Sequence, residues 1–116
     1  MEEKLGNQIN VLSSHYIRRL LSIGKPFVLR INGDSMEPYL FRGDYVMVEP
    51  TSNSYKEQDL VLIDWGDQFV VHRLVDPQKL RTKGDNLCDF DPPGLPIVAR
   101  CKRCSRRNNE TENSYR

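Results

Sequence analysis

Apolar residues recur at two different spacings along the chain, and the change of spacing predicts where a helix gives way to strands. Between residues 8 and 23 they recur every three or four positions, which is typical of an amphipathic helix. These positions are Ile9, Leu12, Tyr16, Leu20 and Ile23. Arg18 and Arg19 are expected to point away from this apolar face, and Gly24, followed closely by Pro26, is a typical stop signal.

After residue 26 the period changes to two and the apolar residues lie in short runs rich in β-branched side chains, which predicts short β-strands. The predicted strands are Phe27–Ile31, Tyr45–Val48, Leu60–Ile63, Phe69–Val75, Lys79–Thr82 and Ile97–Ala99. Gly-Asp, Asp-Pro and Pro-Gly pairs lie between them and indicate turns. Short strands at this spacing predict a mostly β fold, a curled, barrel-like antiparallel sheet with one short N-terminal helix.

Composition divides the chain of 116 residues into three segments around a single core. Residues 1–25 form the predicted helical segment, and residues 26–101 form the β domain. Residues 102–116 are polar, with arginine, asparagine, glutamate and serine in place of apolar residues. Such a composition cannot bury enough apolar surface to become ordered, so the sequence predicts a disordered tail.

Charge and hydropathy exclude several classes of protein. A net charge of +1 argues against a nucleic-acid binder that works through bulk charge. No run approaches the roughly 20 apolar residues of a membrane-spanning helix, and the start Met-Glu-Glu-Lys lacks the apolar core of a secretory signal peptide. We therefore expect a cytoplasmic protein, with peripheral membrane association through the N-terminal helix as the alternative.

The three cysteines form an odd set, which suits a reducing compartment better than a disulfide framework. Cys101 and Cys104 have the spacing of zinc ligands, but a structural zinc site needs four ligands. The simpler interpretation is two free thiols near the C-terminus. We expect neither a metal ion nor a cofactor.

Ser35 is the candidate nucleophile. It follows the Gly33-Asp34 pair at a turn between two predicted strands, where its hydroxyl can point out of the backbone toward a base and a carbonyl. The chain offers only two histidines as a base. His15 lies on the predicted helix, whereas His72 alternates with apolar residues in a predicted central strand. A lone strand histidine is more often structural, so its role depends on the rest of the sequence.

Three ordered motifs resemble those of the signal peptidase I family. The segment Ser-Met-Glu-Pro-Tyr-Leu-Phe-Arg-Gly-Asp, residues 35–44, is similar to its nucleophile motif Ser-Met-x-Pro-x-Leu-x-x-Gly-Asp. The run Val-Val-His-Arg, residues 70–73, is similar to the strand that carries the base, which lies directly before an arginine. Residues 82–86, Thr-Lys-Gly-Asp-Asn, are similar to a box beside the active site. Any one motif could arise by chance, whereas three in the family's order indicate a relationship.

The resemblance implies that Ser35 is the nucleophile and His72 the base, as in the endoplasmic-reticulum and archaeal branch, rather than the Ser/Lys pair of the main bacterial branch. It also implies two functional aspartates, which correspond to Asp85 and Asp91. Either carboxylate could accept the hydrogen bond from the imidazole N–H. Asp89, two residues before Asp91, could take the place of Asp91. The backbone N–H of Ser35 is the expected first donor of the oxyanion hole.

One position departs from the family pattern, and three others are open to two interpretations. Gly33 lies where many members carry a second hydroxyl, so the side-chain half of the oxyanion hole is missing. Met36, Pro38 and Tyr39 are candidates for a shallow substrate groove, with a place in the scaffold or the core as the alternative.

The expected activity is a serine endopeptidase that cleaves precursor, signal or leader peptides after small residues, with the substrate bound as an extended strand. The expected lack of an anchor makes soluble precursor peptides an alternative to secretory ones. A self-cleaving regulator of the LexA/UmuD type is a second interpretation, although such proteins use a lysine base and cut an Ala-Gly or Cys-Gly bond that does not occur before Ser35. A peptide-binding module without catalysis is a third. The sequence leaves the oligomeric state open.

Overall fold

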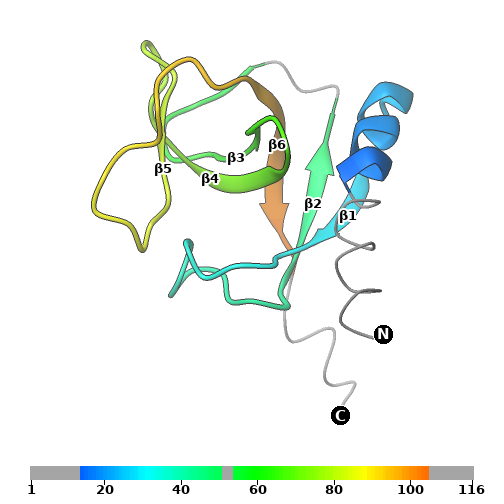
Figure 1. Ribbon diagram of the computed structural model, residues 1–116, viewed down its shortest axis with the longest axis horizontal. Helices are drawn as coiled ribbons and strands as arrows, with labels where there is room; N and C mark the ends of the chain where they lie inside the picture. Colours follow the sequence, from blue (N-terminus) through cyan, green and yellow to red (C-terminus); the bar gives the residue numbers. More distant parts are fainter. Residues whose placement is uncertain (1–13, 51–53, 105–116) are drawn as a thin grey trace.

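The computed structural model describes residues 14–50 and 54–104, which form one helix and one antiparallel sheet (Figure 1). The described part of the helix covers residues 14–23. The strands are β1 (Phe27–Arg30), β2 (Tyr45–Glu49), β3 (Leu60–Asp64), β4 (Phe69–Asp76), β5 (Arg81–Lys83) and β6 (Ile97–Arg103). Their order in the sheet is β1-β2-β6-β3-β4-β5, so β1 and β5 are edges and the curled sheet is not closed into a barrel. The predicted mostly β fold with one short helix is confirmed.

β5 begins later than the sequence pattern predicts. Lys79 and Leu80 lie in a turn over residues 77–80 instead of in the strand. The Asp76 carboxylate accepts hydrogen bonds from the backbone amides of Gln78 and Lys79, at 3.1 and 3.3 Å, and Leu80 has a φ of 53°. The side chain of an aspartate thus closes a turn that the apolar pattern alone does not reveal.

β6 continues past the predicted end of the β domain at residue 101. Lys102 and Arg103 lie opposite Met47 and Val46 of β2, and the amide of Cys104 donates to a β2 carbonyl at 3.0 Å. The predicted start of a disordered tail at residue 102 is therefore wrong, because ladder hydrogen bonds pair the backbone whatever the polarity of the side chains. Residues 105–116 of that predicted tail lie outside the described residues.

β3 is buried on both faces and joins two clusters of the core. Leu60 and Leu62 pack into the larger cluster, with the helix, β1 and β2. Val61 and Ile63 point to the opposite face, where they form a smaller cluster with Leu74 of β4. Burial on both faces explains why this strand is a continuous apolar run instead of an alternating one.

The helix packs on the larger cluster through a different face from the predicted one. Ile17 is buried, with 8% of its surface exposed, and Leu21 packs beside it. Tyr16 and Ile23, predicted on the apolar stripe, are 62% and 60% exposed. The predicted residues 8–13 of the helix lie outside the described part of the chain. Within that part, no helix has the length and apolar character needed to cross a membrane.

Arg18 lies next to the buried Ile17 and contacts the β3–β4 hairpin. Its guanidinium donates to both carboxylate oxygens of Asp64, at 2.8 and 3.1 Å, and to the carbonyl of Gly66 at 2.8 Å. It also lies over the Phe69 ring, 4.8 Å from the centroid. The hydrogen bonds from Arg18 lower the pKa of Asp64. An arginine expected to point away thus ties the helix to the β3–β4 hairpin.

We expect Leu62→Ala to lower the free energy of unfolding by about 2–5 kcal/mol, because it leaves a cavity in a fully buried part of the core. Urea denaturation followed by circular dichroism measures this change. Val28→Ala is the control, since Val28 is 52% exposed on an edge strand and should change stability by less than about 0.5 kcal/mol. Similar losses for both variants would contradict the packing described here.

Candidate active site

Ser35 and His72 come together from parts of the chain whose strands are not neighbours in the sheet. Ser35 lies in a turn between β1 and β2, and its hydroxyl oxygen is 3.0 Å from Nε2 of His72 on β4. The amides of Tyr39 and Leu40 both donate to the Met36 carbonyl, at 2.9 and 3.0 Å. Because Met36 and Leu40 are buried, they fix the turn to the core while Ser35 remains half-buried at its surface.

His72 lies on the face of β4 that carries the smaller core cluster, and its side chain is 5% exposed. The Trp65 ring meets it edge-on, with the ring centroids 6.2 Å apart. Nδ1 lies 2.7 Å from Oδ2 of Asp91. Since an ionised carboxylate can only accept, Nδ1 carries the proton and Nε2 can accept from the Ser35 hydroxyl.

Asp91 is itself held in place from β5. Its side chain is 3% exposed, and the Thr82 hydroxyl donates to the same Oδ2 at 2.7 Å. The Asp91 amide donates to the Thr82 carbonyl at 2.9 Å. One continuous chain of hydrogen bonds therefore runs from Thr82 through Asp91 and His72 to Ser35.

The structure separates the carboxylates that the sequence left as alternatives. Asp85, predicted beside His72, instead binds Arg73, with Arg73 Nε and Nη2 at 2.9 and 2.8 Å from its two oxygens. The side-chain hydrogen bonds to Asp85 raise the pKa of Arg73. Asp89 is exposed. Successive residues of a strand point to opposite faces, so His72 and Arg73 take different aspartates.

The loop after β5 also holds the nucleophile turn directly. The Asn86 amide donates to the Ser35 carbonyl at 2.8 Å, and its side chain donates to the Asp34 carbonyl at 3.1 Å. A Cβ on Gly84 would lie 2.8 Å from the Ser35 carbonyl oxygen and 3.1 Å from Nε2 of His72. Only glycine therefore fits at position 84 without a shift of the site.

Sequence reasoning missed the parts played by Gly84, Asn86, Thr82 and Trp65. The first three lie within the Thr-Lys-Gly-Asp-Asn motif, whose family resemblance points only to its aspartate. Closer attention to its glycine and threonine could have suggested a tight approach and a hydroxyl donor. Nothing in the sequence indicated that Trp65 lies against His72.

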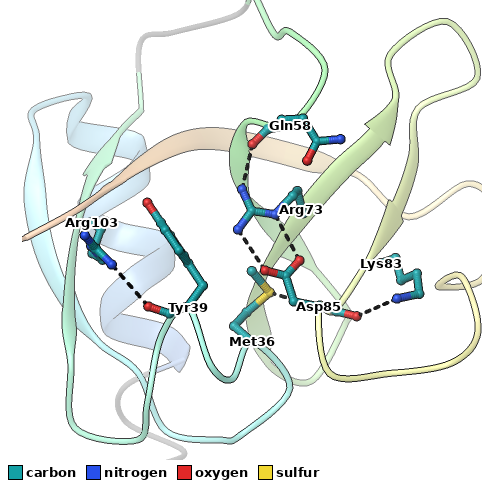
Figure 2. Close-up of polar contacts among 8 residues, drawn as sticks. Met36, Tyr39, Gln58, Arg73, Lys83, Asp85 and Arg103 are labelled. Carbon is teal, nitrogen blue, oxygen red and sulfur yellow. Dashed lines mark hydrogen bonds and ion pairs between the residues drawn. The ribbon is translucent and has the colours of Figure 1, made fainter.

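Met36 takes the alternative position, in the core. This side chain is 2% exposed and belongs to the larger core cluster, because a long apolar side chain gains most by burial there. Figure 2 shows the Tyr39 ring between the guanidinium groups of Arg73 and Arg103, so both of its faces are covered. Pro38 follows a cis peptide bond and is exposed.

The remaining candidate ligands do not gather. Across residues 14–50 and 54–104, no group of three or more histidine, cysteine, aspartate or glutamate side chains could hold a metal ion. Cys88, Cys101 and Cys104 are free thiols. His15 is exposed on the helix.

A hydroxyl, an imidazole and a carboxylate joined in this order have the arrangement found in serine hydrolases. Residues 6–86 match the family model described as Peptidase S24-like. The chain therefore belongs to the Peptidase S24-like family, a serine peptidase-like group that includes self-cleaving LexA/UmuD-type and signal peptidase I-like members. The matched region contains Ser35, His72 and Gly84 and ends before Asp91. Comparison with curated proteins and with solved structures gave no match.

We expect Gly84→Ala to lower the free energy of unfolding by about 1–3 kcal/mol, because the added methyl group meets backbone and imidazole atoms that cannot move freely. Thermal and urea denaturation measure the loss. Gly33→Ala is the matched control in the same site, since a Cβ there meets nothing within 4 Å. A Gly84→Ala protein as stable as Gly33→Ala would show that the loop does not approach the turn so closely.

Cys101 should resist alkylation in the folded protein. Burial raises the pKa of its thiol to about 12, so almost no reactive thiolate exists at pH 8. Cys88, which is exposed, should react with iodoacetamide under the same conditions, as peptide mapping by mass spectrometry would record. In guanidinium chloride the two should react alike. Equal rates in the native protein would contradict the burial of Cys101.

Proposed function

We propose that this protein is a serine endopeptidase in which Ser35 is the nucleophile, His72 the general base and Asp91 the residue that orients the imidazole. One observation carries the proposal. The Ser35 hydroxyl oxygen lies 3.0 Å from His72 Nε2, and His72 Nδ1 lies 2.7 Å from the Asp91 carboxylate. Serine alone is a weak nucleophile, and a base within hydrogen-bond reach is what activates it.

In the proposed reaction Ser35 Oγ attacks a peptide carbonyl while His72 Nε2 takes the hydroxyl proton. The imidazolium that forms is stabilised by Asp91, which keeps the proton on Nδ1 and holds the ring in place. His72 and Asp91 are nearly inaccessible to water, with side chains 5% and 3% exposed, so their attraction is weakly screened. His72 then donates its proton to the leaving amine, and water hydrolyses the acyl-enzyme.

The oxyanion is proposed to bind the backbone N–H of Ser35. Among the residues that the structure describes, no acceptor is paired with this amide. Gly33 supplies no hydroxyl as a second donor, and the space beside its Cα is open. A site with one protein donor for the oxyanion should turn over more slowly than one with two, because each donor contributes to transition-state stabilisation.

The proposed substrate is an extended precursor or leader peptide cut after a small residue. Such a substrate would bind as an extended strand with its scissile carbonyl next to the Ser35 hydroxyl. A Ser/His pair resembles the endoplasmic-reticulum and archaeal branch of signal peptidase I, whereas the LexA/UmuD type uses lysine. We place the catalytic domain at residues 26–103, preceded by a helical segment, and propose a cytoplasmic enzyme that acts on precursor peptides.

The test is cleavage of a mixed peptide library by the purified protein, with products identified by mass spectrometry. We expect Ser35→Ala and His72→Ala to lose about 10³-fold or more in kcat/KM, because either change removes the activated nucleophile. Asp91→Asn should lose on the order of 10²- to 10⁴-fold, because the imidazole loses its orienting carboxylate. Asp89→Asn is the matched control, two residues away and exposed, and should stay within about twofold of the wild type.

Other outcomes identify the alternatives. Retained cleavage by Ser35→Ala would contradict the assigned nucleophile. Peptide binding without cleavage, equal in wild type and Ser35→Ala, would identify a binding module. Shortening of the wild-type protein on standing at alkaline pH, absent in Ser35→Ala, would identify a self-cleaving regulator.

A further inference from the structure

Side chains from both faces of β4 contact the nucleophile turn, residues 35–39. On one face His72 reaches Ser35. On the other face the guanidinium of the next residue, Arg73, lies over the Tyr39 ring, 4.8 Å from its centroid. Tyr39 lies four residues after Ser35 in the same turn, so two adjacent strand residues hold the two ends of this turn.

Tyr39 is also held from a third strand. Arg103, at the end of β6, places its guanidinium 4.6 Å from the same ring centroid, and its Nη1 lies 3.5 Å from the Tyr39 carbonyl oxygen. Figure 2 shows the ring between the two arginines. The β6 backbone is fixed at this point, because Arg103 lies opposite Val46 in the ladder with β2.

Charge explains why two guanidinium groups can lie so close together. The faces of an aromatic ring carry negative potential and attract cations on both sides. Arg73 is further neutralised by the paired hydrogen bonds to Asp85, and its Nη1 donates to the Gln58 carbonyl at 3.0 Å (Figure 2). Arg73 is therefore a fixed support, and the Tyr39 ring takes its position from it.

Backbone contacts connect the ring to the nucleophile. The Tyr39 amide donates to the carbonyl of Met36, the residue next to Ser35, at 2.9 Å. The Asp85 amide lies 3.4 Å from the Met36 sulfur, so the aspartate that holds Arg73 also touches this turn. A shift of Tyr39 would act on the Met36 carbonyl, next to Ser35, and misplacement of a reacting group by about 1 Å can cost on the order of 10²-fold in rate.

We propose that Tyr39 is a positioning residue for Ser35, clamped between Arg73 and Arg103. The clamp acts on the nucleophile through the turn and does not touch the substrate. The inference rests on the proposed function, because the direction of the Ser35 hydroxyl matters for catalysis only if Ser35 is the nucleophile. It also gives Arg103, a residue beyond the predicted β domain, a part in catalysis.

The kinetic test uses the peptide cleaved by the wild-type protein. We expect Tyr39→Leu to lower kcat about tenfold, because both cation–π contacts are lost, with KM within about twofold. Tyr39→Phe keeps the ring and should restore kcat to within about twofold of the wild type. Arg103→Gln should lower kcat about threefold, and Arg103→Lys should lie between Arg103→Gln and the wild type.

Tyr45→Leu is the matched control. Tyr45 also forms a cation–π pair, in which the guanidinium of Arg30 lies 6.0 Å from the ring centroid. This pair is separate from the clamp of Tyr39 between Arg73 and Arg103. Its loss should leave kcat within about twofold of the wild type. If Tyr45→Leu lowers kcat as much as Tyr39→Leu, or if Tyr39→Phe is as slow as Tyr39→Leu, the clamp is refuted.

A second readout needs no substrate. Nitrogen-15 NMR of the His72 ring reports the hydrogen bonds at Nδ1 and Nε2 separately. In Tyr39→Leu we expect the Nε2 signal to lose its hydrogen bond to Ser35 while the Nδ1 signal keeps its bond to Asp91. Absence of peptidase activity in the wild type would end the proposed function but leave this measurement intact. An Nε2 signal unchanged in Tyr39→Leu would overturn the positioning role.

Discussion

The opposite orientation of two consecutive residues in β4 organises the whole site. A strand directs His72 to one face and Arg73 to the other, and each meets one aspartate from the same loop. The loop over residues 84–91 can therefore bind both faces of one strand. The nucleophile turn lies between these contacts, with Ser35 at the imidazole and Tyr39 at the guanidinium.

This arrangement gives each part of the Thr-Lys-Gly-Asp-Asn motif a physical reason. Thr82 holds the Asp91 carboxylate, Gly84 lets the loop approach the serine, Asp85 fixes Arg73, and Asn86 binds the turn. The motif is thus mainly a support for the residues around it. The proposed orienting carboxylate, Asp91, comes five residues after the motif, beyond the region matched by the family model.

The sequence predicted the class of fold and identified Ser35 and His72 as a candidate pair. Both could be predicted because the spacing of apolar residues and the order of the motifs are properties of the chain itself. It could not choose between Asp85 and Asp91, since that choice depends on which face of β4 the loop crosses. It placed Tyr16 and Ile23 on the packed side of the helix, because the spacing of apolar residues alone does not reveal that Ile17 and Leu21 are the ones that pack on the sheet. It ended the β domain too early, because the pairing of Lys102 and Arg103 with β2 does not depend on their side chains.

The double burial of β3 has a consequence for how the molecule responds to ligands. Its alternate side chains belong to both hydrophobic clusters, so neither face of the sheet can open without exposing the other. Segments that share a core in this way unfold as one cooperative unit. A peptide bound at the Ser35 turn would therefore slow the hydrogen exchange of those helix amides that exchange only when this shared core unfolds, since binding to the folded state alone stabilises every part that unfolds with it.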